Sequence, residues 1–544
     1  MATIFGSGAM TNSIREIEGM EVIFVIGSNT KETHPVVANR MLKAIRGGAK
    51  LIVADPRRVP MTRFAEVHLQ LRPGTDVALL NGMARVILKE GLQNQHFIAE
   101  RTQGFQDWCR SVEEFTPQYV EKITGVPRQD LLRAARLYGS SRRAGIFYTM
   151  GITQHTSGTD NVNAIANLAL LTGNIGTPHA GINPLRGQNN VQGACDAGCL
   201  PNVYPGYQRV EVPQVREKFS RAWGVELPGR PGLTSTEMIE AALEGHLRGM
   251  YVMGENPVLT DPYQGKTLKA LKQLDFLLVQ DIFLTETAEL AHVVLPAACF
   301  AEKEGTFINT ERKVQLLQKA VEPPGQARQD LWILQELSRL LGYPMHYGSA
   351  EEVFEELGSL WPALAGISYS RLRQGGIQWP CPTREHPGTE YLYRSGFPRG
   401  KPSFTVVNWN PPAELPDEDY PLLLTTGRNL FQYHGGSMTR RVAPIEAHAG
   451  EPYVELSPED AQALGLRQGQ VVRVSSRRGS VELRARISRG AQKGVVFLPM
   501  HYREACVNVL TNDALDAYAK TPELKACAVR IEALPQRGRR RRGK

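Results

Sequence analysis

Short runs of consecutive apolar residues recur in the first part of the chain, and each ends in a polar turn. The runs span residues 22–26, 51–54 and 67–71, and the first is followed by Gly27-Ser28-Asn29. A strand that is buried on both faces of a parallel sheet has this continuous apolar pattern. The residues at about 34–45 suit a helix that ends at a glycine pair. The pattern therefore predicts a strand–helix–strand unit with polar loops at its strand ends.

The same layout returns near the middle of the chain. The apolar run 250–253 leads to Gly254-Glu255-Asn256, and Asp281 ends the next run as Asp55 does in the first copy, at nearly the same distance from the glycine. Open parallel sheets bind ligands at the carboxyl ends of their strands, where a glycine turn admits a phosphate. Two copies therefore predict two nucleotide-binding turns, although neither has the GxGxxG fingerprint. Helix capping is the alternative role for the two aspartates.

Farther along the chain, the pattern changes to short strands separated by turn formers. A further strand at 144–148 precedes a helix at about 160–171, and residues 330–360 have helical periodicity. Prolines and glycines indicate a linker over 391–412. The strands expected beyond it are typical of a small β-barrel and span 421–425, 453–456, 471–475, 481–487 and 494–498.

These patterns predict an α/β fold class with two pseudo-repeated parallel-sheet dinucleotide-binding domains plus a C-terminal β-barrel domain. A chain of 544 residues is too long for one ordinary core. We expect a first α/β dinucleotide-binding domain over residues 1–188 and a second, with a helical segment, over 189–402. A cofactor-capping barrel should follow over 403–535, and a basic disordered tail over 536–544.

Most of the net charge of +8 is concentrated at the C-terminal end. The last eight residues include five arginines and one lysine, so the rest of the chain is nearly neutral and does not suggest a nucleic-acid partner. The seven cysteines form no CxxC pair, and the sequence has neither a secretory segment nor an apolar run long enough for a bilayer. We therefore expect reduced thiols, no membrane span and a cytoplasmic location.

One polar segment lies between the two copies, and it contains a single cation. Residues 183–198 read Asn-Pro-Leu-Arg-Gly-Gln-Asn-Asn-Val-Gln-Gly-Ala-Cys-Asp-Ala-Gly, with Arg186 among amides and glycines. Glycine lets a backbone approach a ligand, and the planar arginine fork matches a carboxylate or a phosphate. The segment is therefore a candidate to close over the crevice between the two nucleotide arms. A surface loop, with Arg186 in an internal ion pair, is the alternative.

Taken together, these motifs resemble the molybdenum or tungsten formate dehydrogenase catalytic subunits of the molybdopterin oxidoreductase family. The resemblance runs from Met1 to about Glu532, and it is most specific over the segment that contains Arg186. It implies two molybdopterin guanine dinucleotides that together hold one molybdenum or tungsten ion. The implied reaction is the reversible two-electron oxidation of formate to carbon dioxide.

The resemblance also implies roles for individual residues. Arg186 would hold the formate carboxylate, and the turn at Gln192 would lie against the pterin. No residue of this chain is implied as a metal ligand. The implied cofactor contacts come from both arms and from the barrel: Gly27, Ser28, Asn29, Asp55, Pro56, Arg57, Gly74, Asp76, Met150, Gly151, Gln154, Gln188, Gly254, Glu255, Asn256, Thr260, Gln280, Asp281, Arg428, Tyr433, His434, Asn508, Tyr518 and Lys520.

The sequence departs from complete members of that family at its start. Those members begin with a cysteine-rich domain that holds a [4Fe-4S] cluster, followed by a cysteine or selenocysteine ligand to the metal. Neither is present here, so we expect a truncated reading of a selenoprotein in which an in-frame UGA was taken as a stop. Such a chain would bind the cofactor without turning over.

The resemblance further implies electron-transfer partners, such as an iron–sulfur subunit, a flavoprotein or a hydrogenase. Two other functions remain open from the sequence. One is a noncatalytic scaffold subunit of a redox complex, and the other is a molybdopterin oxidoreductase that acts on nitrate or another oxyanion.

Overall fold

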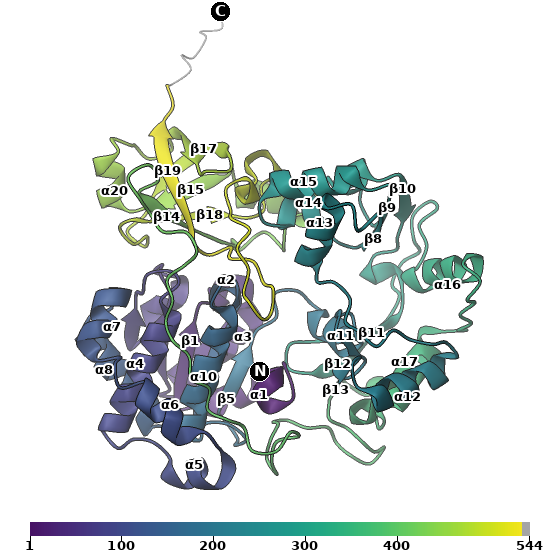
Figure 1. The fold of residues 1–544 in the computed structure, drawn as a ribbon, viewed down its shortest axis with the longest axis horizontal. Coiled ribbons are helices and arrows are strands. Elements are labelled where there is room, and N and C mark those ends of the chain that lie inside the picture. The colour runs from purple at the N-terminus through teal and green to yellow at the C-terminus, as the bar shows by residue number, and fades with distance from the viewer. Residues whose placement is uncertain (536–544) are drawn as a thin grey trace, which may run out of the picture.

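The first lobe is built on a sheet of parallel strands with helices on both faces (Figure 1). The computed structural model describes residues 1–535, so the tail expected at 536–544 lies outside the described residues. The strand order is β3-β2-β1-β4-β5, and neighbouring strands are parallel throughout. The strands are β1 (Val22–Ile26), β2 (Lys50–Ala54), β3 (Val67–Leu69), β4 (Ala144–Tyr148) and β5 (Gly181–Pro184). The first three apolar runs are therefore strands, as predicted.

Side chains of β1 enter two different cores, which explains why the run is apolar at every position. Phe24 and Ile26 pack with helices α4, α8 and α10, whereas Ile23 and Val25 pack with α3 on the opposite face. Successive side chains of a strand point to opposite faces, so one strand supplies both cores. The helices of this lobe are α1 (Ala2–Phe5), α2 (Thr30–Thr33), α3 (Pro35–Arg46), α4 (Asp76–Lys89), α5 (Gln95–Arg101), α6 (Phe105–Ser111), α7 (Pro117–Thr124), α8 (Arg128–Ser140), α9 (Met150–Thr153) and α10 (Gly158–Thr172).

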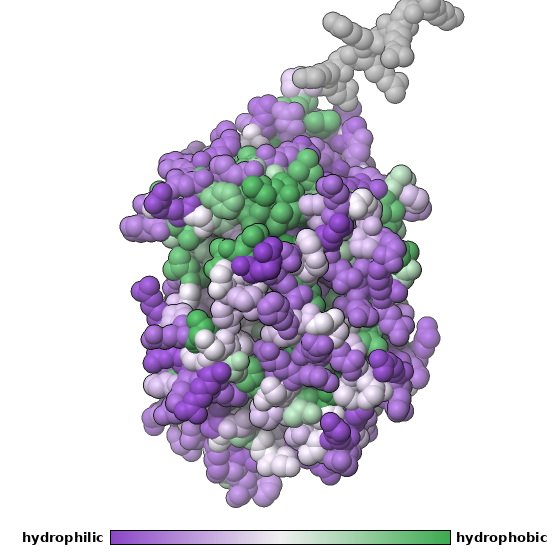
Figure 2. Space-filling view, turned by 90° about the vertical axis from the view of Figure 1, so that its right-hand side faces the viewer, coloured by the Kyte–Doolittle hydropathy of each residue, from purple (hydrophilic) through white to green (hydrophobic). Residues whose placement is uncertain are grey.

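The second lobe contains a smaller parallel sheet that is covered on one face only. Its order is β10-β9-β8, formed by β8 (Gly249–Met253), β9 (Phe276–Asp281) and β10 (Val293–Pro296). Helices α13 (Ser235–Leu243), α14 (Pro257–Thr260) and α15 (Gln264–Gln273) supply the apolar core against this sheet. Tyr251, Met253, Phe276 and Val293 are each at least 40% exposed. Figure 2 shows apolar side chains gathered in the upper part of this side of the molecule.

Two helices replace the single helical stretch that we expected over 330–360. They are α16 (Asp330–Leu340) and α17 (Ala350–Leu360), and residues 341–349 between them are not helical. Gly342 has a positive φ of 79° and Pro344 cannot continue a helix, so the expectation was wrong for this segment. A small antiparallel sheet lies nearby, made of β11 (Gly305–Ile308), β12 (Lys313–Leu317) and β13 (Ile377–Gln378). The remaining elements are α11 (Val191–Asp196), β6 (Val203–Tyr204), β7 (Gln208–Arg209), α12 (Pro213–Trp223) and α18 (Tyr369–Leu372).

The C-terminal lobe is a closed barrel with the strand order β14-β18-β15-β17-β16-β19. Five of its strands fall where short strands were predicted, and α19 (Ala443–Ala449) and α20 (Pro458–Ala463) lie between them. The last strand was not predicted, and it closes the barrel by pairing with both β14 and β16. The strands are β14 (Leu422–Gly427), β15 (Tyr453–Leu456), β16 (Val471–Ser475), β17 (Ser480–Ile487), β18 (Val495–Pro499) and β19 (Cys527–Ala533).

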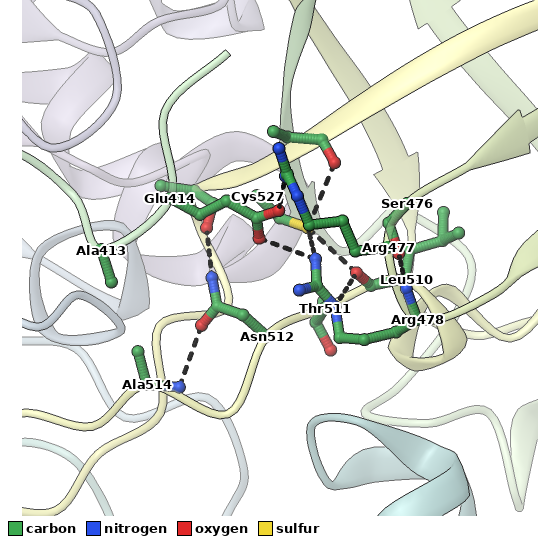
Figure 3. Close-up of polar contacts among 12 residues, drawn as sticks. Ala413, Glu414, Ser476, Arg477, Arg478, Leu510, Thr511, Asn512, Ala514 and Cys527 are labelled. Carbon is green, nitrogen blue, oxygen red and sulfur yellow. Dashed lines mark hydrogen bonds and ion pairs between the residues drawn. The ribbon is translucent and has the colours of Figure 1, made fainter. Parts of the chain in front are cut away.

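The linker between the second lobe and the barrel runs back along the first lobe. Its apolar residues join the core of that lobe, namely Leu392, Tyr393, Phe404 and Val407. At its far end, Glu414 accepts hydrogen bonds from Arg477 and, at 2.7 Å, from Arg478 of the barrel (Figure 3). Arg478 also lies 2.9 Å from the thiol of Cys527 in β19. A mostly buried ion pair therefore attaches the linker to the barrel wall.

The structure adds three further observations. No helix in residues 1–535 is long and apolar enough to cross a membrane. The seven cysteines are free thiols. No group of three or more histidine, cysteine or acidic side chains in the described part of the chain could hold a metal ion.

Candidate functional site at the switch point of the first sheet

A cavity lies beyond the carboxyl ends of β1 and β4, where the strand order of the first sheet reverses. It encloses about 1210 Å³, part of which is open to solvent. Ligands of open α/β sheets bind at this kind of switch point. Twelve of the residues singled out in the sequence line the cavity: Gly27, Asn29, Asp55, Pro56, Arg57, Asp76, Met150, Gly151, Gln154, Gln188, Arg428 and His434.

Two glycines bring the turns after β1 and β4 into backbone contact. Gly27 has a φ of 57°, and the Gly151 amide donates to its carbonyl oxygen at 3.2 Å. A Cβ atom on Gly151 would lie 2.4 Å from that same oxygen. Only glycine permits such an approach. The wall of the cavity at this point is therefore bare backbone.

Buried ionisable groups surround the cavity, and one of them is a lysine. Lys525, just before β19, donates to the carbonyl oxygen of Thr426 at 2.8 Å, and burial lowers its pKa to about 8. Burial raises the pKa of Asp55 to about 6 and that of Asp76 to about 7. The charge of Asp55 partly opposes the lowering of the Lys525 pKa, but Lys525 forms no salt bridge with a carboxylate in residues 1–535. A buried cation without an ion-pair partner facing a cavity favours an anionic ligand.

Hydrogen bonds hold both the backbone and the side chain of Arg186. Its backbone amide donates to Thr310 Oγ1 at 3.0 Å, and its carbonyl oxygen accepts from His34 Nε2 at 2.6 Å. Its guanidinium donates to Gln192 Oε1 and to the carbonyl oxygen of Gly8, both at 3.2 Å. No salt bridge joins it to a carboxylate among the described residues, so the internal ion pair considered from the sequence is not found there. The partly buried guanidinium therefore remains able to bind an anion.

The barrel contacts both lobes through the loop 428–441. Arg428 donates to the carbonyl oxygen of Gly187 at 2.9 Å, next to Arg186 in the first lobe. On the other side of the loop, a Cβ on Gly435 would lie 3.1 Å from Thr260 of the second lobe. This loop therefore contacts the first lobe beside Arg186 and the second lobe at the end of α14.

Two family models match the chain. Residues 3–340 match molybdopterin oxidoreductase, and residues 422–528 match the molybdopterin dinucleotide binding domain. The chain belongs to the molybdopterin oxidoreductase family. The second match covers most of the barrel, including β14 and the loop that follows it.

Named relatives extend this assignment over almost the whole chain. The F420-dependent formate dehydrogenase subunit alpha of Methanocaldococcus jannaschii is 50% identical over 538 residues, covering 98% of this chain and 80% of that protein. Formate dehydrogenase H of Escherichia coli K12 is 42% identical over 536 residues, covering 97% and 75%. The solved structure of acetylene hydratase from Pelobacter acetylenicus has a TM-score of 0.74 at 22% identity, over 98% of this chain and 80% of that one. The expected α/β fold with a C-terminal barrel is confirmed.

The cavity fits the dinucleotide of a molybdopterin oxidoreductase. Four of its lining residues have a buried polar atom with no hydrogen-bond partner among residues 1–535, namely Asn29 Oδ1, Arg57 Nε, His155 Nδ1 and Arg428 Nε. Buried polar groups are normally satisfied, and leaving one unpaired costs about 1–3 kcal/mol. A polar, phosphate-bearing ligand would supply the missing partners and would neutralise Lys525.

The second glycine turn of this molybdopterin oxidoreductase does not line that cavity. Burial raises the pKa of Glu255 and Asp281 there, and their mutual repulsion adds to the effect on Glu255. Asp281 Oδ1 also accepts from the backbone amides of Ile282 and Phe283 in the turn that follows β9. The next helical element begins only at Ala288, so this is not the helix-capping role that we considered. Asn256 Oδ1 accepts from Thr287 within its own lobe. Carboxyl groups therefore lie at this second turn, whereas the cavity at the first turn is lined by cations from other segments as well as by acids.

The other residues selected from the sequence also lie outside the cavity. Tyr518 is 70% exposed, and Asn508 donates to the carbonyl oxygen of Leu259 at 2.9 Å. Gln192 is buried behind Arg186 rather than at the cavity wall. The remaining residues of this group are Ser28, Gly74, Gly254, Thr260, Gln280, Tyr433 and Lys520.

The residues selected from the sequence leave out part of the cavity lining, including two buried ionisable side chains. Lys525 and His155 both line the cavity, and burial, together with nearby Lys525, lowers the pKa of His155 to about 4. Lys525 follows an irregular loop and has no motif around it. Its position at the cavity depends on the closure of the barrel, which no local pattern indicates.

Proposed function

We propose that this chain is the cofactor-binding body of a formate dehydrogenase catalytic subunit, which oxidises formate to carbon dioxide with two electrons in a reversible reaction. The observation that carries the proposal is Arg186, a partly buried and doubly anchored guanidinium that has no carboxylate partner in residues 1–535. Its segment lies beside the cavity, since Gly187 and Gln188 line it. The similarity to two formate dehydrogenases supports the choice of formate.

The proposed cofactor is bis(molybdopterin guanine dinucleotide) with molybdenum or tungsten. Lys525, Arg57 and Arg428 would hold one dinucleotide. Glu255 in the turn after β8 and Asp281 at the end of β9 would hold the other through the donor groups of its guanine or sugar. When bound, this group accepts the two electrons of formate. We further propose residues 1–188 and 189–402 as the two binding domains and 403–535 as the barrel that caps them.

In this proposal, Arg186 binds formate and orients it. Formate is a one-carbon anion, and a guanidinium can engage both of its oxygens through parallel N–H donors. Gln192 and the Gly8 carbonyl fix the plane of the guanidinium before the anion arrives. Preorganised donors of this kind lower the barrier because they need no rearrangement during reaction.

Electrons would leave through partner subunits, for which an iron–sulfur protein, a flavoprotein or a hydrogenase is suited. A [4Fe-4S] cluster in a preceding domain is part of this proposal, because the resemblance that led to it includes such a domain. The relative from Methanocaldococcus jannaschii is named as a subunit, which supports a multi-subunit assembly.

The test combines chemical analysis with an arginine substitution. We expect the purified holoenzyme, including the preceding domain of this proposal, to contain molybdenum or tungsten and guanine nucleotide, and to reduce a dye with formate. Arg186→Lys should lower kcat/KM for formate by about 100-fold or more, because a lysine loses the fork, while metal content is unchanged. Arg209→Lys, at an exposed ion pair, is the matched control.

Each alternative function predicts a different result in this experiment. Protein without metal or guanine nucleotide would identify a scaffold subunit. Protein that carries both but turns over nitrate and not formate would identify an oxyanion reductase.

A further inference from the structure

Behind Arg186, a line of hydrogen bonds runs into the protein along helix α11. Arg186 Nε donates to Gln192 Oε1 at 3.2 Å, and Gln192 Nε2 donates to Asp196 Oδ1 at 2.6 Å. Gln192 is 1% exposed and Asp196 is fully buried. The two side chains are four residues apart, so they share one face of the helix. An acid out of reach of any substrate is thus connected to the guanidinium through one amide.

Asp196 is fixed by donors from other parts of the chain. Trp379 Nε1 donates to its Oδ2 at 2.7 Å, and the amide of Gly206 donates to its backbone oxygen at 2.7 Å. Asp196 has no salt bridge among the described residues. Both carboxyl oxygens therefore act as acceptors, one for Trp379 and one for Gln192.

The amide of Gln192 has only one orientation that satisfies its neighbours. Its nitrogen faces two acceptors, Asp196 Oδ1 and, at 3.0 Å, the hydroxyl of Tyr207. Its oxygen then faces the Nε–H of Arg186. Rotating the amide by half a turn would place the Gln192 oxygen against the Asp196 carboxylate and the Gln192 N–H groups against the Nε–H of Arg186. The site is buried, so water could not compensate for these contacts.

We propose that Asp196 is a positioning residue, which sets the orientation of the Gln192 amide and through it the plane of the Arg186 guanidinium. The inference rests on the proposed function, because it assigns Arg186 the task of holding formate. Burial raises the pKa of the Asp196 carboxyl to about 7, against the lowering effects of its hydrogen-bond partners and of Arg186. The position is costly for an acid, and a leucine or an asparagine would avoid that cost.

The first test is Asp196→Asn in the holoenzyme. Asparagine has one oxygen where aspartate has two, so Trp379 and Gln192 compete for it and the Gln192 amide is free to rotate. We expect kcat/KM for formate to fall by about 10- to 100-fold, since small misplacements of an orienting group have effects of this size. The formate dissociation constant, measured by calorimetry, should rise as well, while metal and guanine nucleotide contents stay the same. Asp275→Asn, at an exposed ion pair with Arg248, is the matched control.

The second test asks whether Asp196 acts through Gln192. Gln192→Met occupies a similar volume but cannot hydrogen-bond to Asp196 or accept from Arg186, so it should lower kcat/KM for formate by about as much as Asp196→Asn. Combining the two substitutions should lower kcat/KM by no more than about a further threefold, because residues that act through one shared contact are not additive.

The outcomes separate the two proposals. A wild-type protein that neither binds nor oxidises formate would overturn the proposed function. A wild-type protein that does both, with Asp196→Asn equal to it or with the losses of the two single variants multiplying in the double variant, would overturn the role of Asp196 alone. If Asp196→Asn does not fold, Asp196→Glu, which keeps the charge but displaces both oxygens, takes its place in the same comparison.

Discussion

At the scale of single residues, the buried acids of the cavity set how stability depends on pH. Asp76 is 4% exposed at the start of α4, and burial raises its pKa from 3.8 to about 7, with the nearby charge of Asp55 adding to the shift. The folded protein therefore binds a proton that the unfolded chain has already released. Stability falls as pH rises through this interval, and the loss is complete above the folded pKa.

We therefore predict that cofactor-free Asp76→Asn is more stable than the wild type at pH 8 but not at pH 4. The gain should be on the order of 1–4 kcal/mol, the equivalent of the shift in pKa. Urea unfolding at the two pH values measures it. Asp107→Asn, at an exposed ion pair, should change neither value, and an equal pH dependence in Asp76→Asn and the wild type would contradict the prediction.

At the scale of elements, the site depends on how closely the ends of two strands approach each other. The turns after β1 and β4 meet at Gly27 and Gly151, whose backbones are in contact. A side chain there would push apart the two strand ends between which the strand order reverses. The binding surface is thus set by strand packing as well as by the polar residues on the turns.

Gly151→Ala should destabilise the protein by roughly 1–3 kcal/mol, as overpacking of a filled interior does, and should reduce the guanine nucleotide that copurifies. Thermal unfolding and nucleotide analysis give the two values. Gly265→Ala is the control, because a Cβ there meets no atom closer than 3.8 Å within α15. Loss of stability in Gly265→Ala but not in Gly151→Ala would refute the argument.

At the scale of the whole molecule, the barrel holds the two lobes in their relative positions. Arg57 of the first lobe donates to Glu455 of β15 at 3.2 Å and stacks 3.5 Å from the ring centroid of Phe497 in β18. Lys266 of the second lobe is ion-paired with Asp513, in the irregular loop before β19. The linker is attached to the same barrel through Glu414 and Arg478. One small barrel therefore determines the distance between two separate sheets.

Glu414→Gln should weaken this attachment by on the order of 2–3 kcal/mol, because it leaves the poorly exposed Arg478 without its carboxylate. Denaturant unfolding and faster amide exchange in β16 and β19 would register the change. Glu482→Gln breaks an exposed pair with Arg473 and should cost about 0–1 kcal/mol, as surface pairs do. Equal losses in the two variants would show that the junction is not a tertiary anchor.

Much of the site could be read from local pattern. The runs at Val22–Ile26 and Gly249–Met253 are both strands, as their continuous apolar pattern predicted. The first is buried at every position, whereas in the second only Val252 is buried. Glycine at the end of a strand indicated a turn that carries a ligand, and Gly27 and Gly151 lie at the cavity. Arg186 was conspicuous because it is a lone cation among amides. The burial of a strand and the geometry of a turn depend on residues that are close in the sequence. The sequence alone therefore determined these features.

What only the tertiary structure decided is which distant groups meet. Nothing near Lys525 indicates a cavity, since its position follows from β19 closing the barrel against β14. The assignment of Gln192 to the pterin surface could not anticipate that its amide is fixed between Asp196 and Arg186, because that depends on Trp379 arriving from far along the chain. Residues 391–409 pack against the first lobe, and the proline and glycine content that indicated a linker does not predict this packing. Hydrogen bonds and desolvation act over a few ångströms in space, and their cost or gain is fixed only after the chain has brought its separate segments together.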